Sequence, residues 1–347
     1  MKTSFISSYA VSQSVRYQIT RMQSELVKAE TEIVTGRVAD TGLHLGARTG
    51  QSVYLEREID RLGTIIDTNN VVSSRLSTTQ KGLDSLTELA KKYLSNMTAA
   101  SSVDPTVVRD EARTTITSMI GVLNTNVNGE NIFAGVNTDV RPINDFMAPG
   151  STARAAMEQA FEDHFGFALT DPQAADVGAD AMTQFLTDVI EPQFMGAEWK
   201  ANWSNASDET ITSRITLTDT TQASVSANAD GVRRLAMSAA VVDVFFGGEL
   251  NVAARNATTD FAGGVVGQAV SDLAQTQAQV GIIEQRVKSA NERLGMQVDI
   301  FKGKTSDMVG VDPYEASSRI SLMLAQIETS YTLTSRMRQL SLVRYLP

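Results

Sequence analysis

The chain has 347 residues, which is long enough for more than one domain and a sizeable core. It contains no Cys and only two His, so disulfide frameworks, thiolate metal sites and cysteine nucleophiles are excluded, and a site built from several histidines is disfavoured. The net charge of −10 disfavours nucleic acid and anionic membranes as partners, because both are negatively charged.

The N-terminal segment predicts no cleaved secretory signal. Lys2 is present, but Ser and Gln interrupt every apolar run in the first twenty residues. No stretch of the sequence approaches the roughly 18 consecutive apolar residues of a membrane-spanning helix. We therefore expect no membrane insertion, and we expect any export to use a route that needs no cleaved signal.

The first predicted helix covers residues 5–35. Its apolar residues alternate in steps of four and three, as in the a and d positions of a heptad, and form one narrow stripe. This stripe contains Val15, Ile19, Met22, Leu26, Ala29 and Ile33. Gly36 is a predicted C-cap. Residues 39–50 contain three glycines and are predicted to form a loop.

A longer helical segment follows, and its length favours a rod over an ordinary globular helix. Its stripe begins with Leu55, Ile59, Leu62 and Ile66 and continues through Val72, Leu76, Thr79, Leu83, Leu86, Ala90, Tyr93 and Met97. The pair Asp104-Pro105 predicts the start of the next helix, with Asp as the N-cap and Pro in the first turn. We expect that helix to end at Asn128-Gly129.

The middle of the chain, residues 136–262, has a different pattern. Residues 151–200 predict short amphipathic helices that are broken by Pro172 and Pro192. Residues 210–227 alternate and are rich in Thr, which predicts two strands and a turn. Residues 230–247 are again predicted to be helical. This region is therefore expected to form an inserted α+β domain.

The last part of the chain repeats the stripes of the first part. The four-three spacing is carried by Val266, Val270, Leu273, Gln277 and Val280, and after a change of phase by Ile283, Val287, Ala290, Leu294, Val298 and Phe301. We expect Gly263-Gly264 to mark the start of this helix, and Gly303, Gly310 and Pro313 to break it. A last helix carries Ile320, Leu324, Ile327, Tyr331 and Thr334.

These stripes predict a mainly α fold. An isolated helix with one apolar stripe is poorly stable in water, so the front and back helices are expected to pair as a long antiparallel coiled-coil rod. The predicted rod core contains Leu76, Leu83, Leu86, Val280, Ile283, Val287 and Leu294. The outermost helices are predicted to pack between molecules, through Val15, Ile19, Met22, Leu26, Ile33, Ile320, Leu324, Ile327 and Tyr331.

No motif predicts catalysis or cofactor binding. Gly303-Lys304-Thr305 ends like a phosphate-binding loop, but Val298 stands where that motif needs a glycine. Asp171, Asp176 and Asp180 do not have the spacing of a calcium loop. His164 has no second His nearby. We interpret these residues as ordinary surface or core residues, and expect no enzyme, metal or cofactor.

Three segments resemble the flagellin family. Residues 23–38, QSELVKAETEIVTGRV, are similar to its N-terminal signature, and residues 128–138, NGENIFAGVNT, to the hairpin that follows its rod helices. The C-terminal end, from Asp312 to Ser341-Leu342 and Tyr345-Leu346, is similar to its terminal helix. The usual Asp-rich stretch after Thr-Gly-Arg is replaced here by Leu43 to Arg48.

The resemblance implies a structural subunit of the extracellular flagellum. It implies an inner layer of terminal helices (1–45 and 305–347), a helical rod with a short hairpin (46–135 and 263–304) and an outer insert (136–262). The Glu25 to Arg37 segment and the Ser-Leu-x-x-Tyr-Leu ending favour the hook-associated branch, which acts as adaptor between hook and filament. A filament subunit and a coiled-coil signalling or adhesion protein remain alternatives.

The same resemblance implies the partners and the export route. The expected partners are the first hook-associated protein, flagellin, the filament cap protein, an export chaperone and further copies of the chain. The implied route is type III export, without a cleaved signal peptide.

Overall fold

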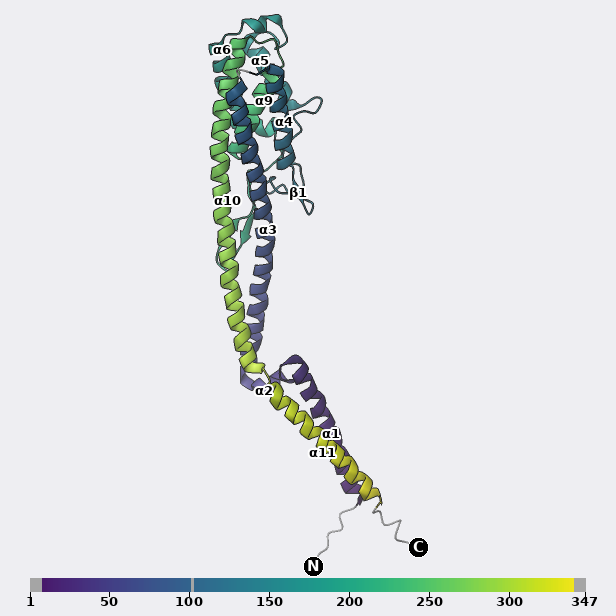
Figure 1. Cartoon of the computed structure of the whole chain (residues 1–347). Helices are drawn as coiled ribbons and strands as arrows, with labels where there is room; N and C mark the ends of the chain where they lie inside the picture. The colour runs from purple at the N-terminus through teal and green to yellow at the C-terminus, as the bar shows by residue number, and fades with distance from the viewer. Residues whose placement is uncertain (1–7, 101–102, 340–347) are drawn as a thin grey trace, which may run out of the picture. The chain divides into compact units, whose positions relative to one another are not determined.

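The structure is a computed structural model that describes residues 8–100 and 103–339. It confirms the mainly α fold with a small antiparallel hairpin (Figure 1). The chain divides into two compact units. The first unit contains residues 1–64 and 294–347, and the second contains residues 65–293. The three layers expected from the sequence stay a prediction, because they describe positions within an assembly.

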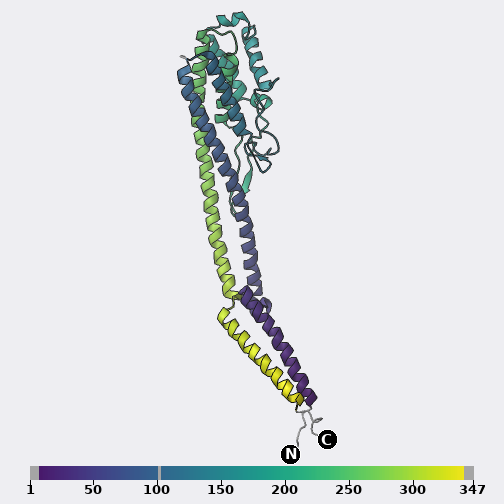
Figure 2. The same ribbon diagram turned by 45° about the vertical axis from the view of Figure 1, so that its right-hand side comes forward.

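The first unit contains both terminal helices, α1 (Ser8–Thr35) and α11 (Pro313–Gln339), which lie side by side (Figures 1 and 2). Gly36 ends α1 in the left-handed conformation, as predicted, with its N–H donating to the carbonyl of Glu32. The carbonyl of Gly36 accepts from Val311 N at 3.1 Å, and Val38 N donates to Val309 O at 2.9 Å. These bonds connect the end of α1 to the start of the last helix.

The predicted loop at 39–50 is wrong. It contains α2 (Thr41–Leu45) and a 3-10 turn, η1 (Gly46–Arg48). Asp40 caps α2, because its Oδ1 accepts from Leu43 N at 2.9 Å. Leu45 is buried and anchors the short helix. One cap and one buried side chain therefore order a segment whose glycine content indicated a loop.

Two long helices form the rod, α3 (Thr49–Ala99) and α10 (Val252–Val309). Within the second unit their apolar stripes share one core, and Thr87 donates to Gln277 across the seam at 3.2 Å. The predicted start of α10 at Gly263-Gly264 is wrong, since the helix begins eleven residues earlier at Val252, with Asn251 as its cap. Gly303 does not break α10 either. A helical glycine costs about 1 kcal/mol, which burial of Thr305 and Val309 nearby can offset.

The next helix, α4 (Pro105–Leu123), begins as predicted. Asp104 accepts from the backbone N–H of Thr106 at 2.8 Å and also from its hydroxyl, and this hydrogen bonding lowers the pKa of Asp104. The predicted end at Asn128-Gly129 is wrong. Both residues have positive φ and form the turn between β1 (Asn126–Val127) and β2 (Glu130–Asn131).

The insert consists of short elements packed around one buried helix, α9 (Asp230–Phe245). The other elements are α5 (Thr152–Phe165), η3 (Pro172–Asp176), α6 (Ala179–Phe185), η4 (Leu186–Ile190), α7 (Glu191–Met195), α8 (Glu198–Asn202), β3 (Thr212–Arg214) and β4 (Thr220–Gln222). Strands β3 and β4 pair antiparallel, as the alternating pattern predicted.

Pro172 and Pro192, the two prolines that were expected to break helices, each begin a helical turn. Pro172 opens η3 and Pro192 stands in the first turn of α7. Because Pro lacks an N–H, the turn before Pro192 widens into the π segment η4, which continues α6 into α7. The predicted interruption at Pro192 was therefore wrong, whereas Pro172 lies in the stretch that separates α5 from α6, as predicted.

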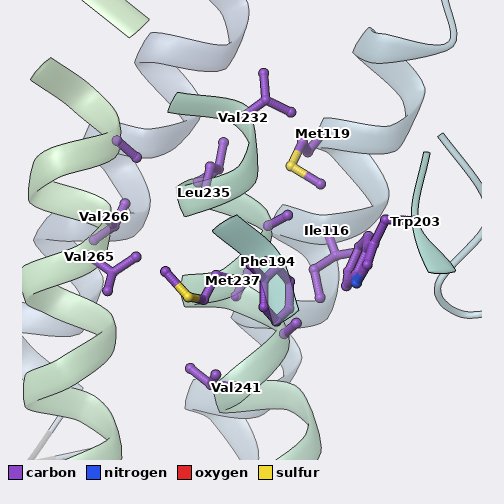
Figure 3. Close-up of a cluster of buried hydrophobic side chains, with 14 of the residues drawn as sticks. Ile116, Met119, Phe194, Trp203, Val232, Leu235, Met237, Val241, Val265 and Val266 are labelled. Atoms are coloured by element: carbon purple, nitrogen blue, oxygen red, sulfur yellow. The ribbon is translucent and has the colours of Figure 1, made fainter. Parts of the chain in front are cut away.

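The core is centred on α9, most of whose residues are buried. Figure 3 shows Leu235 and Met237 of α9 between Val266 of α10 and Met119 of α4. Beside them Trp203 stacks between Phe146 and Trp199, with ring centroids 4.7 and 5.4 Å away. Both tryptophans are buried and belong to the core of the insert.

A buried carboxylate joins three helices of this core. Asp243 of α9 has no exposed side-chain surface, and Arg113 Nε lies 2.6 Å from its Oδ1. Arg109, also on α4, lies 3.4 Å from Oδ1, and Arg154 of α5 binds Oδ2. Because a buried charge needs partners, this cluster fixes α4 and α5 on α9.

Gly135 is required by both its conformation and its surroundings. Its φ is 65°, and a Cβ there would lie 2.5 Å from the carbonyl oxygen of Ser207 and 2.6 Å from that of Glu209. We expect Gly135→Ala to destabilise the insert by more than the conformational cost alone, which is about 1–2 kcal/mol. Gly150→Ala is the matched control, since Gly150 has φ 79° and open space around it. Equal losses in thermal melts of the two variants would contradict the role of the contact.

Candidate assembly surface

The terminal helix pair buries one narrow apolar seam. On α1 the buried residues are Ile19 and Ala29, and Val15, Met22 and Leu26 of the same stripe are half-buried. On α11 Ala316 and Met323 are buried, while Ile320 and Ile327 are half-buried. The seam keeps the four-three spacing on both helices, as in a two-stranded coiled coil.

The seam on α11 differs from the predicted stripe. The prediction placed Leu324 and Tyr331 in line with Ile320, but the seam uses Met323 and leaves Leu324 51% and Tyr331 53% exposed. The predicted stripe and the observed stripe on α11 both have four-three spacing. The stripe that packs against α1 is the one that contains Ala316. A small residue there lets the helices approach closely, and nothing in the spacing alone indicates it.

The predicted interface residues therefore fall into two groups. Val15, Ile19, Met22, Leu26, Ile320 and Ile327 face the seam within the chain. Ile33, Leu324 and Tyr331 are exposed. Sequence reasoning missed further exposed apolar residues of the same helix pair, which are Tyr17, Val27, Val34, Tyr314, Leu322 and Leu333. We call all nine exposed residues the outer apolar set.

The outer apolar set places nine large apolar side chains on the surface of two helices. Apolar side chains that are concentrated on one exposed element mark a candidate contact with a partner. Beside it lies a groove of about 460 Å³ between α1 and α11, lined by Met22 and Ala325 together with polar residues. The pair thus presents apolar side chains and a groove that a further helix could fill.

Polar contacts fix the alignment of the pair. Arg319 lies 3.3 Å from Glu32 of α1 and 3.0 Å from Glu315 of its own helix. Gln23 Nε2 donates to the Tyr331 hydroxyl at 3.2 Å. These contacts are exposed, so each contributes at most about 1 kcal/mol. They define how the two helices are aligned more than they stabilise them.

The predicted rod-core residues lie at the seam of α3 and α10. Leu76, Leu83, Leu86, Val280 and Val287 are buried in the second unit, and Ile283 packs against the same core half-buried. Leu294 is buried in the first unit. Tyr93, which the rod-core prediction omitted, is also fully buried; desolvation raises the pKa of its hydroxyl, which donates to Ser238 O at 3.4 Å.

No ligand-binding chemistry accompanies this surface. Among the described residues, no group of three or more His, Asp or Glu side chains is arranged to hold a metal ion. Within the same residues, no helix combines the length and apolar character needed to cross a bilayer. His164 stacks edge-on against Phe165, and Asp171 caps η3 through Gln173 N.

Two family models match the chain. The bacterial flagellin N-terminal helical region matches residues 6–138, and the bacterial flagellin C-terminal helical region matches residues 264–346. Together they cover α1, α3, α4 and the β1–β2 hairpin at one end, and most of α10 with α11 at the other. The chain belongs to the flagellin family. It is a structural protein of the bacterial flagellum, and members of this family are not enzymes.

Among solved structures, this flagellin-family chain is similar to one from Vibrio parahaemolyticus, described as a presumed flagellar hook-associated protein. The TM-score is 0.50 at 10% sequence identity, and the match covers 76% of this chain and 97% of the other. At this identity the similarity supports the shared fold. No curated protein matches the chain significantly by sequence. The family implies self-association and contact with other axial proteins of the flagellum.

Proposed function

We propose that this flagellin-family protein is the adaptor at the junction between hook and filament. The observation that carries the proposal is the outer apolar set on the paired terminal helices, because it suits a subunit that is completed by its neighbours. The C-terminal ending and the 97% coverage of a presumed hook-associated protein support the junction over the filament.

The mechanism is geometric. Repeated head-to-tail contacts between identical subunits generate open helical stacks. In the proposed tube, the terminal pair of each copy contacts neighbouring pairs through Ile33, Leu324 and Tyr331, while the insert (136–262) faces outward. In this tube, the subunits at one end would contact the first hook-associated protein, and those at the other end would contact flagellin. One kind of subunit would therefore join the lattice of the hook to the lattice of the filament.

The same proposal specifies the route to that position. The chain would be exported by the flagellar type III apparatus with an export chaperone, and would assemble outside the cell below the filament cap protein. Each of these partners is proposed from the family and the motifs at the two chain ends.

Immunogold labelling of isolated flagella tests the location. An antibody against residues 136–262 should label one narrow zone between hook and filament, and no zone in flagella from a strain that lacks the protein. Labelling along the whole filament would instead identify a filament subunit, which is the second candidate because the same family models describe filament flagellins.

A further inference from the structure

A buried asparagine interrupts one apolar row of the long rod helix α3. On α3 the buried residues recur every seven positions, at Leu55, Leu62, Asn69, Leu76, Leu83, Ala90 and Met97. All are apolar except Asn69, which is 0% exposed. Leucine has the same number of side-chain heavy atoms with the same branching, and it would complete the series. The asparagine therefore needs a reason other than packing.

Asn69 binds two partners from distant parts of the chain. Its Nδ2 donates to Asn291 Oδ1 on α10 at 2.8 Å and to the carbonyl oxygen of Ile215 at 2.9 Å. Ile215 is buried and follows β3 directly, at the tip of the β3–β4 hairpin. Asn69 thus connects both rod helices to a segment of the insert.

The hairpin lies over the rod and has a second attachment. Its residues 211–223 alternate between covered and exposed positions, and Ile215, Thr221 and Ala223 are buried (Figure 1, teal, beside α3 and α10). At the tip, the two oxygens of Asp219 lie 3.1 and 3.2 Å from Arg286 of α10. The hairpin is therefore held to α3 by Asn69 and to α10 by Arg286.

The balance of hydrogen bonds indicates that Asn69 contributes specificity more than stability. Its Oδ1 is buried without a hydrogen-bond donor among the described residues, and such a group costs about 1–3 kcal/mol. Buried polar residues in coiled coils are known to fix one arrangement at a cost in stability. Here the arrangement that Asn69 can fix is the position of the β3–β4 hairpin on the two rod helices.

We propose that the β3–β4 hairpin, residues 211–223, is a strap that crosses the seam of α3 and α10. The hydrogen bond from Asn69 to Ile215 is the latch that holds this strap in place. The strap holds the two rod helices together at this level through polar contacts that can open without unfolding the core. Releasing the latch loosens the hairpin from α3, while Arg286 still holds it to α10 and the apolar seam beneath it stays intact.

Hydrogen exchange of the full-length protein tests the latch. In Asn69→Leu, the carbonyl of Ile215 loses its donor, so exchange in residues 211–223 should rise about five- to tenfold, as expected for one lost hydrogen bond. Exchange in the flanking rod, residues 72–97 and 276–290, should stay within twofold, and the melting temperature should not fall.

Thr79→Val is the matched control. Thr79 is also 0% exposed on α3, but its hydroxyl donates to Arg75 O of its own helix. This variant should leave exchange of residues 211–223 unchanged. Unchanged strap exchange in Asn69→Leu would overturn the proposal. A rise of equal size throughout residues 65–293 would overturn it too, because Asn69 would then be an ordinary core residue.

Discussion

Leu324→Asp should abolish incorporation into the flagellum and leave the folded monomer almost unchanged. Leu324 is half exposed on α11, so the new carboxylate stays solvated in the monomer and should change its stability by no more than about 0.5 kcal/mol. If an assembled neighbour covers this face, the same carboxylate is buried without a partner, which costs several kcal/mol per subunit. The measurement is restoration of filaments in a strain that lacks the protein.

Leu83→Asp provides the opposite case. Leu83 is 0% exposed at the seam of α3 and α10, so the variant should lose several kcal/mol of stability as a monomer. Ser318→Asp is the control for position, since Ser318 is exposed on the same helix but outside the outer apolar set. Thermal melts that show equal losses for Leu324→Asp and Leu83→Asp would place the terminal helix in the monomer core and refute assembly through this face.

Asp243→Asn should destabilise the second unit strongly. The substitution keeps the size of the side chain but leaves three guanidinium groups around a neutral amide. Breaking a buried ion pair costs about 3–5 kcal/mol, and we expect about 3 because the arginines keep partial access to water. For a unit of this size, the melting temperature should fall by roughly 6–12 °C.

The control for Asp243 is a similar pair that is partly solvated. Asp272 binds Arg234 Nε at 2.9 Å, and about a third of the Asp272 side chain is exposed. Asp272→Asn should therefore cost no more than about 1 kcal/mol. A loss for Asp243→Asn as small as that for Asp272→Asn would mean that the cluster contributes little to the position of α4 and α5.

The sequence was sufficient for features that repeat along a helix or that depend on neighbouring residues. The four-three spacing at 72–97 and 276–301 predicted the long helices, and Asp104-Pro105 predicted the start of α4. The hairpin around Asn128-Gly129 was expected from a family motif, although the preceding helix ends earlier than predicted. These signals are local, so no knowledge of the rest of the fold is needed to interpret them.

The remaining features depend on residues far apart in the chain. Asp243 contacts Arg109 and Arg154, which are 134 and 89 positions away, and no periodicity connects them. On α11 two overlapping stripes fit the same spacing, and only the packing against α1 selects Met323 over Leu324. Glycines such as Gly303 indicated a break because propensity was considered without the packing of the helix around them.

The stacked indoles have a practical consequence for following assembly. Trp199 and Trp203 are the only tryptophans of the chain, and both are buried within the insert. Intrinsic tryptophan fluorescence therefore reports the solvation of this region alone and is insensitive to events at α1 and α11. If the terminal helices join neighbouring subunits while the insert keeps its fold, the emission wavelength should stay constant through polymerisation, even as light scattering increases.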